Sequence, residues 1–349
     1  MVRRNRIFTA LCFVSAVTLV AYIHWANTRG DEAHGTKGDG EPASQGGGSP
    51  SNGAQNKPSK RIFFRYDGAG SHYGHLAIAP YECPERPQFV DALSCEVAHV
   101  AGGRGICLAA NRGLFATYAA KIFDAKTFRI HAQIPLKGVP SRCRVSTDGK
   151  LAALTVFVSG HGYDSMNFST QTLLIDADNG RIISDLEGFT VTSNGQPISN
   201  NDFNFWGVTF TPDSRHFYAT LSTNRRRFLV KGDIACRSVE VIHDNVECPS
   251  LAPDASRIAY KKRFIVDGRV VWRLYVLDLK TNQETPLSEK RNVDDQPEWL
   301  DNDHVLYSLP ETETGSGPSA DIWLAGADGV GPPRLFLKKA YSPAVAPSL

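Results

Sequence analysis

Short turns that contain aspartate recur along this chain at a spacing of roughly fifty residues, and short apolar runs flank each of them. Asp and Asn side chains hydrogen-bond their own backbone in tight turns, and Gly supplies positive φ, so such turns join neighbouring strands into hairpins. One kind of turn follows a first strand and occurs in residues 145–152, 210–214, 251–255 and 299–303. A second kind joins a third strand to a fourth and occurs in residues 124–127, 176–180, 232–233, 278–282 and 326–329.

A period of this length, with four strands in each repeat, is typical of the blades of a β-propeller. The runs Leu173–Asp176 and Leu274–Asp278 are apolar and partly β-branched, as strands buried between stacked blades should be. About 290 residues follow Lys60, which is enough for six blades at this period. We therefore predict an all-β, six-bladed propeller. A β-sandwich with several hairpins is the alternative, but it does not explain the repeat.

The two ends of the repeat region carry parts of a single blade. Ala340–Pro347 matches the start of the repeat at Cys248–Pro253, and the turn and second strand of that repeat do not follow it. The strand-like runs Arg61–Tyr66 and Gly74–Ala79 precede the first full repeat. We expect these runs to complete the last blade, so that N-terminal and C-terminal strands share it and leave no unpaired edge.

The sequence before the repeats begins with a basic segment and an apolar run. Residues 1–6 contain three arginines, residues 7–26 are apolar and long enough to cross a bilayer, and Asp31 and Glu32 follow them. The positive-inside rule predicts a cytoplasmic segment 1–6, a transmembrane signal-anchor helix 7–26 and an extracytoplasmic remainder. A cleavable signal peptide is the alternative, but the run lacks a small-x-small cleavage site at its end.

Residues 27–60 contain eight glycines and no Leu, Ile, Val or aromatic residue. Such a stretch cannot bury enough apolar surface to fold. A random coil of this length has a root-mean-square reach of about 30 Å. We therefore predict a disordered linker that tethers the propeller, residues 61–349, to the outer side of the cell membrane.

The net charge is only +2, from 38 basic and 36 acidic residues, so no global field recruits nucleic acid. The sequence contains no His-Glu-x-x-His zinc motif, no phosphate-binding glycine loop and no Gly-x-Ser-x-Gly elbow. His72 and His75 would lie on opposite faces of an extended segment, which does not suit a shared metal ion. We therefore predict no catalytic residue, no metal and no cofactor.

Six of the seven cysteines lie outside the apolar run and invite disulfides in an exported domain. Two pairs are each twelve residues apart, Cys95 with Cys107 and Cys236 with Cys248. If residues 102–105 form the turn of a hairpin, Cys107 lies opposite Val100 rather than Cys95, so a bridge there needs irregular pairing. We expect at least one disulfide, and its partners stay open.

Several segments support a resemblance to a known family. Residues 145–149, 210–214 and 251–255 resemble the Ser-Pro-Asp-Gly turns of TolB-type six-bladed propellers. The longer segments 95–108, 203–210, 247–254 and 293–300 are similar to membrane-anchored TolB-like proteins of actinobacteria. This resemblance covers the chain after Lys60 and implies an extracytoplasmic propeller with no established reaction. TolB itself is a periplasmic binding platform, but its additional N-terminal domain has no counterpart in this sequence, so the resemblance does not extend to the Tol-Pal role.

Propeller topology predicts where a ligand would bind. The first strand of each blade lines the central channel, and the start of that strand shares one face with the loop between the second and third strands. Near the axis on that face we place Arg142, Asn204, Trp206, Glu247, Asp295, Gln296 and Glu298. Around its rim we place His161, Tyr163, Lys261, Lys262 and Arg263. The alternative for the aromatic member, Trp206, is packing between blades.

A concave face that mixes aromatic, acidic and basic groups suits recognition of an envelope protein, a peptide or a glycan by a monomeric propeller. Two classes of function therefore fit the sequence. The first is a noncatalytic scaffold or sensor in the cell envelope. The second is a hydrolase or lyase with its site in the channel, because propellers host such sites and a fold alone does not exclude them.

Overall fold

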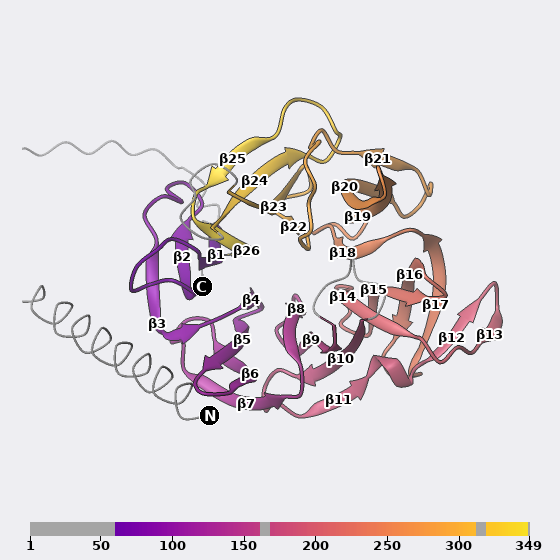
Figure 1. Ribbon diagram of the computed structural model, residues 1–349, viewed down its shortest axis with the longest axis horizontal. Coiled ribbons are helices and arrows are strands. Elements are labelled where there is room, and N and C mark those ends of the chain that lie inside the picture. The colour runs from indigo at the N-terminus through magenta and orange to yellow at the C-terminus, as the bar shows by residue number, and fades with distance from the viewer. Residues whose placement is uncertain (1–59, 161–167, 312–318, 348–349) are drawn as a thin grey trace, which may run out of the picture. The chain divides into compact units, whose positions relative to one another are not determined.

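The computed structural model describes residues 60–160, 168–311 and 319–347, which form a ring of six sheets (Figure 1). Within these residues there are 26 strands, and the only helix is the single 3-10 turn η1 (Leu186–Gly188). The predicted all-β, six-bladed propeller is confirmed. The segments predicted to be cytoplasmic, membrane-spanning and linker fall in residues 1–59 and lie outside the described residues.

Each blade contains four antiparallel strands, which are listed here from the axis outward. Blade 1 contains β4 (Val97–Ala101), β5 (Arg104–Arg112), β6 (Ala116–Asp124) and β7 (Ile130–Leu136). Blade 2 contains β8 (Val139–Val145), β9 (Leu151–Ser159), β10 (Ser169–Asp176) and β11 (Ile182–Asp185). Blade 3 contains β14 (Asn204–Phe210), β15 (His216–Thr223), β16 (Arg226–Asp233) and β17 (Ser238–Asp244).

The remaining three blades follow in the same way. Blade 4 contains β18 (Glu247–Leu251), β19 (Arg257–Val266), β20 (Arg269–Asp278) and β21 (Glu284–Pro286). Blade 5 contains β22 (Glu298–Trp299), β23 (His304–Pro310), β24 (Ala320–Gly326) and β25 (Arg334–Leu337). Blade 6 contains β26 (Ala340–Pro347), β1 (Lys60–Tyr66), β2 (His75–Pro80) and β3 (Gln88–Ser94).

Blade 6 closes the ring with strands from both ends of the described chain. Strand β26 pairs antiparallel with β1, with Lys60 opposite Pro347 and Tyr66 opposite Ala340. The predicted sharing of one blade is therefore confirmed. Strand β26 ends at Pro347, so this register places Lys60 at the end of the blade where β26 finishes, opposite to the end where it begins.

The aspartate turns form as expected from local hydrogen bonding. The side chains of Asp148, Asp213 and Asp254 accept the backbone N–H two residues further on, at 3.1, 2.9 and 3.0 Å. Asp124 and Asp278 accept the backbone N–H groups two and three residues further on, at distances from 2.7 to 3.1 Å. In each of these turns the aspartate thus satisfies one or two of the backbone donors of the turn itself.

The core is divided among the seams between neighbouring blades. Leu108 and Leu154 pack in the seam between blades 1 and 2, and both are almost completely buried. Phe64 and Leu306 pack in the seam between blades 5 and 6. Alternating strand residues face the two neighbouring seams, so most central strands are apolar on both faces.

Blade 3 carries an additional hairpin that the repeat did not predict. Strand β12 (Thr190–Ser193) pairs in parallel with β17 and antiparallel with β13 (Gln196–Ile198). The turn residues Asn194 and Gly195 have positive φ, as a two-residue hairpin turn requires. The connection from blade 2 to blade 3 therefore extends the sheet outward before it returns to the axis.

A disulfide joins Cys95 to Cys107, with a Cα–Cα distance of 5.4 Å. The expectation of at least one disulfide is confirmed, but the assumed turn at residues 102–105 was wrong. Gly102 and Gly103 alone form the turn, because both have positive φ, so Cys107 lies opposite Ala98. The bridge forms just before β4, where the regular ladder has ended. Cys83, Cys143, Cys236 and Cys248 have free thiols.

Candidate ligand-binding face

The first strands of the six blades surround the axis of the ring (Figure 1). Strands β4, β8, β14, β18, β22 and β26 each contact the first strand of both neighbouring blades. We call the end at which these strands begin the mouth face, and the opposite end the far face. The loops between second and third strands lie on the mouth face, and Lys60 lies on the far face.

A buried ion pair crosses the axis between opposite blades. The Arg144 guanidinium on β8 contacts the Glu298 carboxylate on β22, and the two side chains are only 10% and 8% exposed. Arg144 also donates hydrogen bonds to Ser250 Oγ at 3.3 Å and to the Pro297 carbonyl at 3.2 Å. Glu298 Oε1 accepts the Val345 backbone N–H at 3.2 Å. These contacts join blades 2, 4, 5 and 6 across the channel.

His99 on β4 adds blade 1 to this network. Its Nδ1 accepts the Val145 backbone N–H at 3.1 Å, and its Nε2 lies 3.7 Å from Glu298 Oε1. Burial, and next the positive charge of Arg144, lower the pKa of His99, so the ring is neutral. Burial raises the pKa of Glu298, but the Arg144 charge and the nearby His99 ring outweigh it and hold that pKa at about 2. The axis therefore holds a charged pair beside a neutral histidine.

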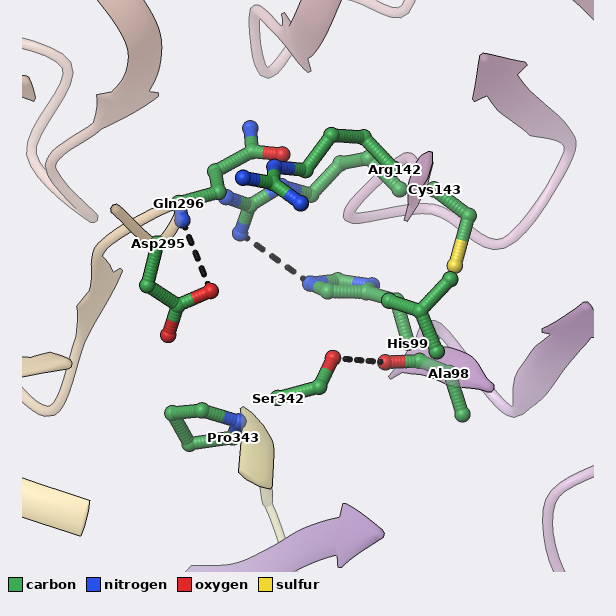
Figure 2. A pocket seen from close by; sticks show the side chains of 10 residues that line it. Ala98, His99, Arg142, Cys143, Asp295, Gln296, Ser342 and Pro343 are labelled. Carbon is green, nitrogen blue, oxygen red and sulfur yellow. Dashed lines mark hydrogen bonds between the residues drawn. The ribbon is translucent and has the colours of Figure 1, made fainter. Parts of the chain in front are cut away.

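A cavity of about 20 Å³ lies beside this network. Figure 2 shows His99 and Ala98 on one side of it and Asp295 and Gln296 on another. The Asp295 carboxylate accepts the backbone N–H groups of Gln296 and Ser308 at 2.8 and 2.9 Å, and burial raises its pKa. The cavity has room for about one water molecule. A larger ligand does not fit in this cavity.

A second charged cluster lies at the channel mouth. Lys261 Nζ on β19 contacts the Asp294 carboxylate, and Arg142 Nη2 lies 3.7 Å from Asp294 Oδ1. Lys261 Nζ also lies 4.8 Å from the ring centroid of Trp272. Burial lowers the pKa of Lys261, but the charges around it, Asp294 first and then Cys248 and Glu247, together raise it above its usual value, so the ammonium stays charged. The prediction that Lys261 lies on the rim was wrong, because its side chain turns inward and is fully buried.

Glu247, the first residue of β18, is fully buried beside this cluster. Its Oε1 accepts the Trp272 indole N–H at 3.0 Å and lies 3.9 Å from Arg227 Nε. Burial raises the pKa of Glu247, and the charge of Lys261 works against that shift. Glu247 thus holds the side chains that form the wall of the mouth.

Trp206 is fully buried between blades, where it packs with Phe157 and Trp272. Packing between blades, the alternative considered for this residue, is therefore the arrangement that the structure shows. A partner could reach the indole ring of Trp206 only if the seam between the blades opened. Asn204, also placed near the axis, accepts the Thr170 backbone N–H at 2.8 Å and so joins blades 2 and 3.

Three of the predicted residues, Arg142, Asp295 and Gln296, line the small cavity at the axis, and the other described ones lie in the walls of the mouth. Lys262 contacts the Glu284 carboxylate and lies over the outer side of blade 4. The Arg263 backbone N–H donates to Asn245 Oδ1 at 3.1 Å. Gln296 Nε2 donates to the Pro249 carbonyl at 3.0 Å, close to the axis. His161 and Tyr163 lie outside the described residues.

Two hairpins project from the mouth face and carry exposed apolar residues. In blade 1, Leu114 and Phe115 lie in the turn between β5 and β6 and are 94% and 81% exposed. In blade 4, Ile265 and Val266 at the end of β19 are 60% and 48% exposed. Blades 1 and 4 are three apart in a ring of six, so these tips lie on opposite sides of the channel mouth (Figure 1).

The two tips rise above the channel mouth. Val97 begins β4 opposite Leu108, and β5 continues four residues beyond that point, to Arg112, or about 13 Å of extended strand. The second hairpin is similar, because Glu247 pairs with Lys261 and β19 continues to Val266. Our sequence reasoning missed these tips. The available signal was a pair of large apolar residues next to a turn glycine, where polar residues are usual.

In the described part of the chain, no three His, Cys, Asp or Glu side chains gather in a way that could hold a metal ion. Within the same residues, no helix has the length and apolar character needed to span a bilayer.

No protein-family model and no curated protein matches this chain, but solved structures do. TolB from Acinetobacter baumannii is 18% identical over 83% of this chain and 67% of its own, with a TM-score of 0.56. A chain of a nidogen/laminin complex is 10% identical over 83% of this chain and 99% of its own, with a TM-score of 0.51. At these identities the similarity concerns the fold, which is that of a TolB-like six-bladed β-propeller.

Proposed function

We propose that this protein is a membrane-tethered, extracytoplasmic propeller that acts as a noncatalytic scaffold or sensor and binds an envelope protein through its mouth face. The observation that carries this proposal is the pair of apolar tips, Leu114–Phe115 and Ile265–Val266. Side chains at this exposure add little buried area to the core, and exposed apolar patches mark interaction sites. Aromatic anchors commonly dominate the affinity of such interfaces.

The arrangement of charge supports a partner that lies across the mouth rather than a substrate that enters the channel. Arg144, Glu298 and His99 all have structural partners at the axis, and the cavity beside them holds about one water molecule. At the mouth, Asp294 is exposed and bridges Arg142 and Lys261. A protein surface seated on the two tips would cover this cluster. The alternative is a channel hydrolase or lyase, and among the described residues the cavity beside the axial network is too small for its substrate.

The proposed tether is compatible with this use of the mouth face. Lys60 begins β1 on the far face, so the preceding chain joins the propeller on the side away from the tips. If residues 7–26 anchor the protein in the membrane, a linker of residues 27–60 leaves the mouth face accessible to other envelope components. One of the solved structures with a similar fold is a chain of a nidogen/laminin complex, which is a complex between proteins.

The partner-binding part of the proposal is tested with photo-crosslinking amino acids placed singly at Phe115, Ile265 and Val330 in the full-length protein. Val330 is the matched control, because it is 73% exposed but lies on the far face between β24 and β25. We expect one discrete crosslinked protein from positions 115 and 265 in the native envelope, and none from position 330. Phe115→Ser should then reduce recovery of that protein at least about tenfold, whereas Val330→Ser should not.

Crosslinks from position 330 alone, or equal recovery with Phe115→Ser, would show that the mouth face is not the interface. An unbiased hydrolase screen of the purified protein tests the alternative, and turnover that is lost on changing a mouth residue would favour an enzyme.

The anchor is tested separately. A reporter fused after Leu349 should be active outside the cytoplasm, and the protein should remain with membranes after carbonate washing. Release of a soluble form that begins near Asn27 would contradict the anchor.

A further inference from the structure

An apolar groove opens on the outer wall of the propeller, between the outer strands of blades 5 and 6. Its volume is about 510 Å³, within the usual range of small-molecule sites. Strand β25 forms one wall, and β1 with the start of β3 forms the other. The apolar lining includes Phe64, Tyr66, Phe89, Leu335 and Leu337.

The groove is the outer opening of the core shared by these two blades. Phe64 and Leu337 belong to that core and are 1% and 7% exposed, whereas Leu335 further out is 39% exposed. Strand β25 has only four residues, so it leaves part of the seam uncovered. Tyr66 and Phe89 meet edge to face at 5.0 Å, which fixes the opposite wall. The groove is therefore preformed.

The mouth-face end of the groove is basic. Lys338 and Lys339 are exposed there, and the Lys339 carbonyl accepts the Asp67 backbone N–H at 2.8 Å, level with the end of β1. Among residues 60–160, 168–311 and 319–347, no carboxylate forms a salt bridge with either lysine side chain, although the Asp321 carboxylate accepts the Lys339 backbone N–H at 2.8 Å. The one acidic residue in the lining, Glu85, precedes β3 and lies toward the far-face end. The groove thus has an apolar floor and a positive charge at one end.

We propose that this groove binds a single-chain amphipathic anion, namely a long-chain fatty acid, with the acyl chain along Phe89 and Leu335 and the carboxylate at Lys338 and Lys339. The supply of such a ligand from the membrane rests on the proposed location, but binding in the groove does not. A peptide or a sugar would bring polar groups along its whole length, and between the lysines and Glu85 the side chains that line the groove are apolar apart from the Tyr66 hydroxyl. The site is also separate from the proposed partner face.

The test is photoaffinity labelling of the full-length protein in phosphatidylcholine nanodiscs. The probe is palmitic acid with a diazirine at the chain end, and labelled peptides are mapped by mass spectrometry. We expect labels on the peptides that contain β25 and the start of β3. Leu335→Asp should reduce this labelling about tenfold or more, because it places a charge in the path of the acyl chain. Ile182→Asp is the matched control, since Ile182 lies on the outer strand β11 and is 48% exposed.

The charge at the basic end is tested with the double change Lys338→Gln and Lys339→Gln. Labelling by the palmitate probe should fall severalfold, whereas labelling by the corresponding neutral alcohol should not change. Melting curves check that Leu335→Asp remains folded, which its exposed position favours. The inference is overturned if the groove peptides are not labelled, if folded Leu335→Asp is labelled like wild type, or if Ile182→Asp loses label equally. An equal loss with the neutral alcohol would refute carboxylate recognition. None of these outcomes depends on whether a protein binds the mouth face.

Discussion

Replacing Arg144 with methionine should destabilise the whole ring, because it removes one partner of the ion pair that crosses the axis. The Glu298 carboxylate is 8% exposed and its pKa is about 2 beside Arg144, so it would remain buried and charged without its main partner. Removing one partner of a buried pair costs about 3–5 kcal/mol. A propeller of about 290 residues has an unfolding entropy near 0.6 kcal/mol per kelvin. The melting temperature should therefore fall by about 5–8 °C.

A double change separates the ion pair from simple packing. When Arg144→Met is combined with Glu298→Leu, no unpaired charge remains, and apolar side chains of similar volume fill the site. Such replacements are often neutral or stabilising, so the double variant should melt within about 2 °C of wild type or above it. Arg226→Met is the surface control. The Arg226–Asp244 pair has side chains 63% and 60% exposed, and its loss should cost less than about 1 kcal/mol.

Thermal unfolding at pH 7, followed by circular dichroism or calorimetry, measures these differences. If Arg144→Met melts within about 1.5 °C of wild type, the Arg144–Glu298 ion pair does not stabilise the propeller. If the double variant loses the sum of the two single losses, the two residues act independently. Either result would refute our account of the axis.

Three further changes test other parts of the fold. Deleting residues 341–349 removes most of β26 and leaves one edge of β1 unpaired. This loss should lower the unfolding free energy by several kcal/mol. A deletion variant that melts within a degree or two of wild type would refute the shared blade. Replacing Cys95 and Cys107 with alanine should cost about 3 kcal/mol, and reductant should produce the same loss in wild type but none in the variant. The pKa of His99 is lowered on folding from its ordinary 6.5, so the unfolded chain binds the proton more readily and wild type should lose stability as pH falls below 6.5. In His99→Asn, whose side-chain oxygen can still accept the Val145 N–H, the fall in melting temperature between pH 7 and pH 5 should be smaller; an equal fall would show that His99 is not the sensitive group.

The resemblance to TolB-type propellers agrees with the structure at the level of the fold. TolB from Acinetobacter baumannii shares the ring architecture at 18% identity. Such distant similarity carries no information about the partner. The proposals on the mouth face and on the acyl groove therefore depend on residues of this chain, and the experiments above address those residues directly.

Much of the fold could be read from local sequence. Asp148, Asp213 and Asp254 bond backbone groups within three residues of themselves, so their turns form wherever that short sequence occurs. Repetition of these turns, with apolar runs of strand length between them, was enough to predict six blades. The shared blade followed because two incomplete repeats at the ends needed each other's strands, and the register of β1 with β26 confirms it.

The candidate site depended far more on tertiary structure. Arg144 and Glu298 are 154 residues apart, and nothing near either residue indicates its partner. Lys261 and Trp206 were assigned to the mouth face, but whether such side chains turn inward depends on the neighbouring blade, which buries both. The exposed tips at Phe115 and Ile265 were missed because exposure also depends on what the neighbouring blades leave uncovered.

Sequence alone therefore determined most of the strands and turns and the number of blades, since these rest on hydrogen bonds and periodicities within a few residues; the hairpin of β12 and β13 and the two-residue turn at Gly102 and Gly103 came only from the structure. Tertiary structure decided which side chains close the axis, which form the groove beside Leu335 and which remain exposed. Those outcomes depend on blades that lie far apart in the chain and adjacent only in the folded ring. Burial and electrostatic partners act through space, so they appear only when the six blades are assembled.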